Sequence, residues 1–155
     1  MKFYMSLIAA AALLAGALPA HADSCDNVVA ALNDTLSNEM GDTINAAELV
    51  NVLRTLNADN NTKLPSKFVT KARAQSLGWR PGSSLWSIRA LYGDSIGGDV
   101  FTNTEGSLPD GYWHEADLDY TGGHRNAKRI VYSTDGQRYV TVDHYADFYA
   151  VDSCD

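Results

Sequence analysis

Several common signatures of enzymes are missing from this chain of 155 residues. It has no Walker-type phosphate-binding loop, no Gly-x-Ser-x-Gly turn and no cysteines at Cys-x-x-Cys spacing. Basic residues are also scarce, because 12 lysines and arginines are outnumbered by 19 aspartates and glutamates. These absences argue against a P-loop NTPase, an α/β-hydrolase and a protein that holds nucleic acid by its overall charge.

One long apolar run, from Leu7 to Leu18, follows Lys2 and leads to small residues that end at Ala22. This pattern is typical of a secretory signal peptide cleaved after Ala22, and the run is short for the alternative, a membrane anchor. We therefore expect a mature chain of residues 23–155 that is secreted or periplasmic and has no membrane segment. Loss of Lys2 changes the net charge from −7 to −8, so any site for a polyanion must be a local basic cluster on an acidic body.

The only two cysteines, Cys25 and Cys154, stand near opposite ends of the mature chain. In an exported protein two such residues are expected to form a disulfide. The chain-entropy model gives a loop of this length a stabilisation of roughly 4–5 kcal/mol. A metal site is not expected, because neither cysteine has clustered cysteine or histidine residues beside it.

Helical patterns come first along the chain and strand patterns follow. Apolar residues predict a short helix after Ser24 within an N-terminal extension, residues 23–42. Further helices are predicted after the cap Asn45, over 71–77 and over 85–91, and strands from Asp99 onward. Because helices and strands do not alternate, we expect an α+β fold, with N-terminal helices packed on one antiparallel sheet in a single domain, residues 43–155.

The dipeptide Asp135-Gly136 separates two strand-like segments. It predicts a two-residue hairpin of type I′. Such a turn would pair Val131 with Val140. It would also place Arg129 and His144 as diagonal neighbours on one face of the sheet.

Acidic residues alternate along the segment 113–120, where Glu115, Asp117 and Asp119 would share one face of a strand. An exposed acidic face is the ordinary explanation. Arg125 and Arg129 follow a short glycine turn, however, and could lie opposite these carboxylates. A carboxylate beside arginines stays ionised and can act as a base.

His144 and Lys71 are the remaining candidates for proton transfer and charge stabilisation. A histidine with a cationic neighbour is suited to donate a proton near neutral pH, although a lone histidine is more often structural. Lys71 begins a helix, where its charge opposes the helix dipole but could help to bind an anion; an exposed lysine is the ordinary explanation. RNA supplies its own 2′-hydroxyl nucleophile, so a base, an acid and cations around the phosphate would suffice to cleave it.

From about residue 46 to residue 151 the chain resembles the bacterial extracellular, guanyl-preferring ribonucleases of the barnase type. The matching motifs are Leu64-Pro65, Thr70-Lys71, Ala74–Trp79, Ser95–Phe101, Asn103, Glu105-Gly106, Leu108-Pro109, Trp113–Asp117, Tyr120-Thr121, Arg125-Asn126, Arg129-Ile130, Tyr132-Ser133 and Asp143–Tyr145. The resemblance implies a microbial ribonuclease fold and a metal-independent endoribonuclease without a cofactor. Such an enzyme cleaves single-stranded RNA after guanosine to give a 2′,3′-cyclic phosphate, which it then hydrolyses.

The resemblance also implies a role for each matching residue. The catalytic set is Glu115 as general base, His144 as general acid, Arg125 and Arg129 as phosphate ligands and Lys71 as a stabiliser of the transition state, with Asp117 supporting the arginines. The substrate-binding set is Phe101, Thr102, Asn103, Thr104 and Glu105, which read the base mainly through Glu105, together with Tyr145.

Thr104 departs from the family, which normally carries an arginine there, so a strong preference for guanine does not follow from the resemblance. A catalytically weakened protein that binds nucleotides or a partner is the alternative function. A glycosidase that uses Glu115 and a nearby aspartate is a third possibility, which the arginine pair disfavours. As partners we expect RNA and a small acidic protein inhibitor, and we expect a monomer.

Overall fold

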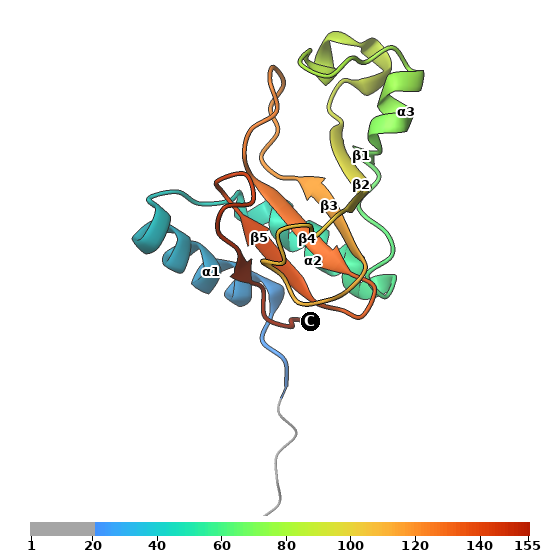
Figure 1. Ribbon diagram of the computed structural model, residues 1–155. Coiled ribbons are helices and arrows are strands. Elements are labelled where there is room, and N and C mark those ends of the chain that lie inside the picture. The colour runs from blue at the N-terminus through green and yellow to red at the C-terminus, as the bar shows by residue number, and fades with distance from the viewer. Residues whose placement is uncertain (1–20) are drawn as a thin grey trace, which may run out of the picture.

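The computed structural model describes residues 21–155 (Figure 1). It has the predicted α+β architecture, with N-terminal helices packed on a six-stranded sheet of order β1-β2-β3-β4-β5-β6. Among the paired strands of this sheet, which all lie within the described residues, only β1 and β2 are parallel. The helices are α1 (Cys25–Met40), α2 (Ala46–Ala58), α3 (Lys71–Ser76) and the 3₁₀ turns η1 (Leu85–Ser87) and η2 (Arg89–Leu91). The strands are β1 (Phe68–Val69), β2 (Ser95–Phe101), β3 (Trp113–Asp117), β4 (Arg129–Ser133), β5 (Arg138–Thr141) and β6 (Tyr149–Ala150).

The helices begin where polar side chains accept hydrogen bonds from their first turns. Ser24 caps α1, and Asn45 caps α2 as predicted, each accepting a backbone N–H three residues later. Beside Asn45, Ile44 and Leu49 are both buried, as expected for a hydrophobic staple. The predicted short helix in the extension is longer than expected, at 16 residues, and ends at Gly41 in the left-handed conformation.

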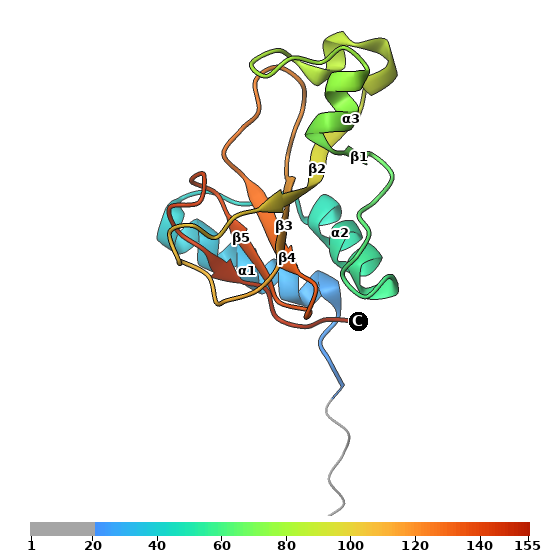
Figure 2. The same ribbon diagram turned by 45° about the vertical axis from the view of Figure 1, so that its right-hand side comes forward.

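Helices α1 and α2 cover one face of the central strands (Figure 2). Apolar side chains from both helices share one core with the inward side chains of β3, β4 and β5, including Leu36, Leu53, Ile130 and Val140. Trp113 and Val131 form a smaller cluster, and alternation along β3 and β4 places it on the opposite face. The residues of this cluster belong to strands and loops, so within residues 21–155 helices α1 and α2 do not cover that opposite face.

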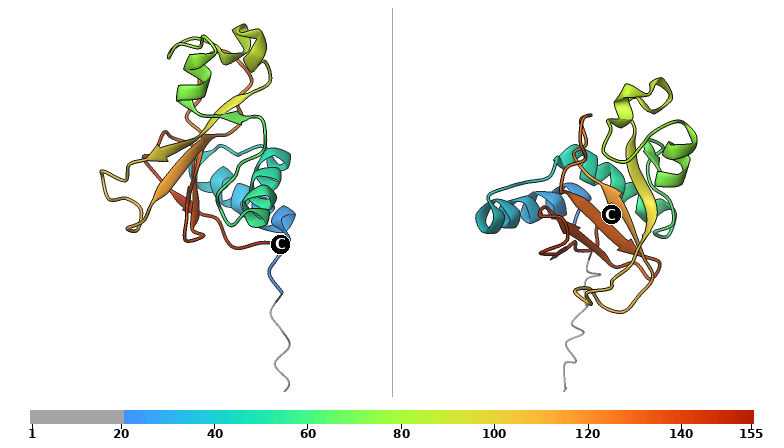
Figure 3. Two further views of the ribbon diagram at one scale, coloured as in Figure 1. Left: turned by 90° about the vertical axis from the view of Figure 1, so that its right-hand side faces the viewer. Right: turned by 45° about the horizontal axis from the view of Figure 1, so that its top comes forward.

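A third cluster belongs to residues 70–94, which we call the α3 module. Trp79, Leu85 and Leu91 are buried there against Ile96 at the start of β2. The α3 module and the loop that follows β2 lie at opposite ends of that strand (Figure 3). Strand β2 thus connects two separate surfaces.

The hairpin between β4 and β5 differs from the prediction by one residue. Ile130, not Val131, lies opposite Val140. Gly136 has a φ of 98° and donates its N–H to the carbonyl of Ser133, whereas Asp135 keeps a negative φ. The turn is therefore a three-residue loop with one left-handed glycine, and the predicted type I′ turn is wrong because that turn needs positive φ at two residues.

The predicted disulfide between Cys25 and Cys154 is present, with an S–S distance of 2.04 Å. It joins the first residue of α1 to the segment after β6, and Asn57 of α2 donates a hydrogen bond to the Cys154 carbonyl at 2.8 Å. The bridge therefore attaches α1 to the rest of the fold. The predicted signal peptide, residues 1–22, lies almost entirely outside the described residues. Within residues 21–155, no helix is long and apolar enough to cross a membrane.

Candidate active site

Strands β3 and β4 bring Glu115, Asp117 and Arg129 to the face of the sheet opposite α1 and α2. Glu115 and Asp117 point away from Ala116, which is buried in the helix-side core. Arg129 lies opposite Asp117 on β4. The carboxylates and one arginine are thus held by regular structure, and loops supply the other groups.

Glu115 is almost completely buried, with 6% of its surface exposed. Its Oε1 lies 2.9 Å from the Lys71 ammonium, and its Oε2 accepts a hydrogen bond from the Tyr145 hydroxyl. Burial and the neighbouring Glu115 raise the pKa of Tyr145, so the phenol remains a donor. An exposed acidic face is therefore the wrong explanation for this strand. The contact with Glu115 places Lys71 inside the site.

Asp117 binds two guanidinium groups at once. Arg125 donates to it from Nε and Nη2, both at 2.6 Å, and this contact raises the pKa of Arg125. The Nε of buried Arg129 lies 2.9 Å from Asp117 Oδ1, although it is not aligned for a hydrogen bond. Arg129 Nη1 instead donates to the carbonyls of Asn126 and Lys128, both at 2.7 Å. One carboxylate and two arginines leave a net positive charge where a phosphate could bind.

Asp119 does not share this face, contrary to the prediction. The chain leaves strand geometry there, with a φ of 58° at Asp119. Its carboxylate accepts the Asn45 N–H at 2.9 Å and lies 3.1 Å from the Lys128 ammonium. Asp119 therefore connects the end of β3 to the start of α2 and is not part of the site.

His144 lies in a loop, residues 142–147, and not in the predicted strand. Both His144 and Tyr145 have left-handed φ values, 58° and 72°. The His144 N–H donates to the Ala127 carbonyl at 3.0 Å, while its exposed imidazole lies 4.9 Å from the Tyr145 ring. The structure thus places His144 beside the residue that contacts Glu115.

The sequence patterns did not identify Asp99, which positions Lys71 in the site. Its carboxylate accepts the backbone N–H of Lys71 at 2.9 Å. This contact fixes the start of α3 and hence the lysine that reaches Glu115. The two residues are 28 positions apart, so no local pattern could have revealed the contact.

The predicted base-binding loop closes a pocket of about 430 Å³ against the His144 loop. Phe101 stacks on Tyr145 with ring centroids 5.0 Å apart. Asn103 shapes the loop, because its side chain accepts the Leu108 N–H and donates to the Leu108 carbonyl. The residues that line the pocket are Phe101, Thr102, Asn103, Thr104, Glu105, Ser107, His144, Tyr145, Ala146 and Phe148. All the predicted substrate-binding residues therefore meet in one pocket next to the candidate acid.

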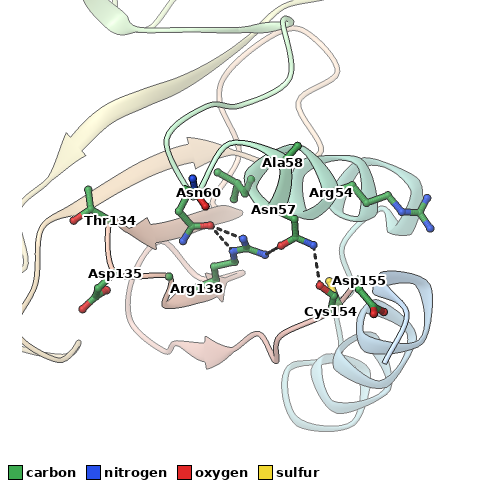
Figure 4. Close-up of a pocket in the computed structure, with 12 residues that line it drawn as sticks. Arg54, Asn57, Ala58, Asn60, Thr134, Asp135, Arg138, Cys154 and Asp155 are labelled. Carbon is green, nitrogen blue, oxygen red and sulfur yellow. Dashed lines mark hydrogen bonds between the residues drawn. The ribbon is translucent and has the colours of Figure 1, made fainter. Parts of the chain in front are cut away.

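A larger cavity of about 840 Å³ lies between the end of α2, the 133–137 turn and the segment after β6 (Figure 4). Arg138 is one of the residues that line it, and donates to the amide oxygens of Asn57 and Asn61. Burial lowers the pKa of Arg138. None of the predicted catalytic residues lines this cavity. Across residues 21–155, no three histidine, cysteine, aspartate or glutamate side chains are grouped to hold a metal ion.

Comparison with known proteins identifies the family of this chain. The family described as ribonuclease matches residues 54–152. The chain belongs to the ribonuclease family. The ribonucleases of Bacillus intermedius and Bacillus pumilus are each 38% identical to it, over 94% of this chain and 93% of theirs. The ribonuclease of Heyndrickxia coagulans is 48% identical over 56% of this chain and 81% of its own. The region that matches the ribonuclease family contains every predicted catalytic and substrate-binding residue.

Proposed function

We propose that this ribonuclease is a secreted, metal-independent endoribonuclease that cleaves single-stranded RNA by transesterification. The observation that carries the proposal is the buried Glu115 held between Lys71 and Tyr145, beside two arginines that share Asp117. A buried base next to an excess of positive charge suits attack on a phosphodiester.

In the proposed reaction, Glu115 accepts the proton of the ribose 2′-hydroxyl. The new bond from O2′ to phosphorus forms as the bond from phosphorus to O5′ breaks, and His144 donates a proton to the departing oxygen. Lys71, Arg125 and Arg129 stabilise the charge on the phosphorane. Water then opens the 2′,3′-cyclic phosphate with the two proton-transfer roles exchanged.

A preference for guanine is a finer part of the proposal. The pocket formed by residues 101–107 and 144–148 has room for a base beside His144, and exposed Glu105 can accept hydrogen bonds from it. A partial relative from Saccharopolyspora erythraea, 44% identical over 55 residues, is described as guanyl-specific ribonuclease St. Thr104 supplies no positive charge, so we propose a preference weaker than an arginine would give.

Export, oligomeric state and inhibitor binding are proposals of the same kind. The apolar run before Ala22 and the disulfide both support passage into an oxidising compartment. We propose that the mature protein acts as a monomer, and that a small acidic protein could inhibit it by covering the cationic site.

The decisive experiment is digestion of a defined single-stranded RNA in EDTA, with analysis of the fragment ends. We expect 2′,3′-cyclic phosphates, mainly after guanosine, and a loss of about 10²–10⁴-fold in kcat for Glu115→Gln or His144→Ala. His124→Ala, at an exposed histidine in the 118–128 loop, is the matched control. Cyclic ends after several bases would retain the chemistry and reject the guanine preference. No cleavage, or full activity of either variant, would overturn the proposal, and RNA binding without cleavage would favour a binding protein.

The same assignment predicts a bell-shaped dependence of kcat/KM on pH. Activity requires an ionised Glu115 and a protonated His144, so it should fall at both acid and alkaline pH. The measurement is the initial rate on a dinucleoside phosphate across the pH range in which the protein remains folded. A rate that changes in one direction only would contradict the pairing of these two residues.

A further inference from the structure

Positive charge is concentrated in one segment of this acidic protein. Between Asp59 and Asp94 the chain contains six lysines and arginines and no acidic residue. The three lysines of this segment each pair with a carboxylate. Arg73, Arg80 and Arg89 are exposed and make no ion pair within the described residues. All three lie in the α3 module.

The α3 module also exposes an aromatic side chain. Tyr92 is 73% exposed, and its ring lies 5.4 Å from that of Trp86. Trp86 in turn packs so closely on Gly122 that a Cβ at that glycine would lie 2.9 Å from the indole ring. Trp86 therefore packs against the 118–128 loop at Gly122, which is three positions before Arg125 in the sequence.

The base pocket and the α3 module lie at opposite ends of the same strand, and this arrangement sets the direction in which a bound RNA strand would run. The base pocket is at the Phe101 end of β2, and the α3 module is at the Ser95 end (Figures 1 and 3). Glu115 pairs with Asp99 between these ends. An RNA strand whose base occupies the pocket, and whose phosphate lies at the arginines, would continue towards the module.

We propose that the α3 module is a second RNA-binding surface, which holds the nucleotides on the 3′ side of the scissile phosphate. Arg80 and Arg89 contact the backbone phosphates, and a base stacks on Tyr92. This inference rests on the proposed function, because the direction of the strand follows from the roles of the pocket and the arginines. Unpaired arginines attract phosphates, and an exposed aromatic ring accepts any base by stacking, so this surface fits single-stranded RNA. The rest of the protein is acidic and repels the strand, which confines it to this path.

Binding can be measured without catalysis. An all-deoxy oligonucleotide lacks the 2′-hydroxyl nucleophile, so its affinity reports on contacts alone, by fluorescence anisotropy. We expect Tyr92→Ala to weaken binding by about tenfold. The double variant Arg80→Gln/Arg89→Gln should reduce the slope of log affinity against log salt by about 1.4, or 0.7 for each phosphate contact on a single strand. Arg54→Gln, at an exposed arginine beside the cavity in Figure 4, is the matched control and should change neither.

Kinetics test which side of the substrate the module holds. We expect the double variant to cleave a dinucleoside phosphate, and a substrate extended only on its 5′ side, at the wild-type kcat/KM. On a substrate with four nucleotides added on the 3′ side, kcat/KM of the double variant should be about tenfold lower than that of the wild type. The inference would be overturned if kcat/KM fell equally on all three substrates, if it fell on none of them, or if it fell only on the substrate with the 5′ extension. Thermal unfolding of each variant checks that these exposed substitutions leave the fold intact.

The two proposals can fail separately. If the wild type binds the deoxy strand through Tyr92 and Arg89 but cleaves no RNA, the proposed reaction is wrong and the binding surface stands. If it cleaves RNA while the module variants behave as wild type on every substrate, the reaction stands and the surface is rejected. If instead the module variants lose only inhibition by an acidic protein, the surface serves a protein partner and the RNA inference is overturned.

Discussion

At the scale of single residues, the site contains two arginines that share one carboxylate. Within residues 21–155, Asp117 is the only carboxylate that contacts both Arg125 and Arg129, and it is 1% exposed. It holds the two guanidiniums in place while neutralising only one of their charges. The remaining charge is available to a phosphate, and this would not be so if each arginine had its own partner.

Removal of the charge at Asp117 should therefore affect both stability and activity. We expect Asp117→Asn to lower the free energy of unfolding by about 3–5 kcal/mol, because two arginines, one of them fully buried, lose their shared anion. The value of kcat should fall as well, since the arginines are no longer oriented. Urea unfolding measures the first effect. Asp26→Asn, in an exposed pair with Arg54, is the control and should cost no more than about 1 kcal/mol. A wild-type midpoint for Asp117→Asn would contradict the account.

Asp143 makes the His144 loop sensitive to acid. Desolvation acts to raise the pKa of Asp143, but hydrogen bonds from Asp147, Thr141 and Ala146 outweigh it and hold that pKa below its usual 3.8. The stabilisation is therefore complete above the ordinary pKa and is lost as pH falls through the lower folded value. We expect Asp143→Asn to be less stable than the wild type at pH 7, with a difference that shrinks below about pH 4. Unfolding free energies at a series of pH values test this, and a difference independent of pH would reject it.

At the scale of elements, β2 must approach its neighbours closely. A Cβ on Gly97 would lie 2.6 Å from the Phe68 ring and 2.9 Å from Ala116. The Cβ of Ala116 is fixed to the backbone of β3, which pairs with β2, so this neighbour cannot move away without disturbing the sheet.

We expect Gly97→Ala to lower the free energy of unfolding by about 1–3 kcal/mol through overpacking. Gly111→Ala is a suitable comparison, because the three atoms nearest to its Cβ would all belong to the Trp113 side chain, at 3.2 Å or more. Urea denaturation of the two variants gives the difference. Equal midpoints for the two proteins would show that β2 has more room than the structure indicates.

Elements with local signals were predictable from the sequence, and contacts between distant residues were not. The cap Asn45 and the predicted helix that begins at Lys71 marked real helix starts, because Asn45 and Thr70 each accept a hydrogen bond from a backbone N–H three positions later. The two-residue strands β1 and β6 gave no periodic signal. The hairpin register failed because Asp135-Gly136 is compatible with two kinds of turn, and backbone φ at Asp135 decides between them.

For the site too, the residues could be named from the sequence, but their contacts could not be predicted. The resemblance named Glu115, Lys71, Arg125, Arg129 and Tyr145, and the structure brings them together. Their contacts come from pairs far apart in sequence, such as Tyr145 with Glu115, 30 positions away. Sequence patterns alone could not indicate which oxygen each donor would meet.

At the scale of the whole molecule, the disulfide joins α1 to the segment after β6. Cys25 and Cys154 are 129 positions apart, so reduction restores a large amount of freedom to the unfolded chain. We expect reduction, or the paired substitution of both cysteines by serine, to lower the free energy of unfolding by about 2–5 kcal/mol. Urea unfolding with and without dithiothreitol measures this loss. The serine variant should show no response to dithiothreitol, and an unchanged midpoint for the reduced wild type would contradict the expectation.

The strands occupy the sheet in the same order in which the chain supplies them. Each strand from β2 onward therefore pairs with one that is near in sequence, and closing each connecting loop costs little entropy. Folding of such a chain can start from the β4–β5 hairpin and add the neighbouring strands one at a time, without inserting a strand between two others. Its refolding after dilution from denaturant should accordingly be limited by the joining of short loops, and should be faster than that of an all-β protein of similar length whose strands pair across distant parts of the chain.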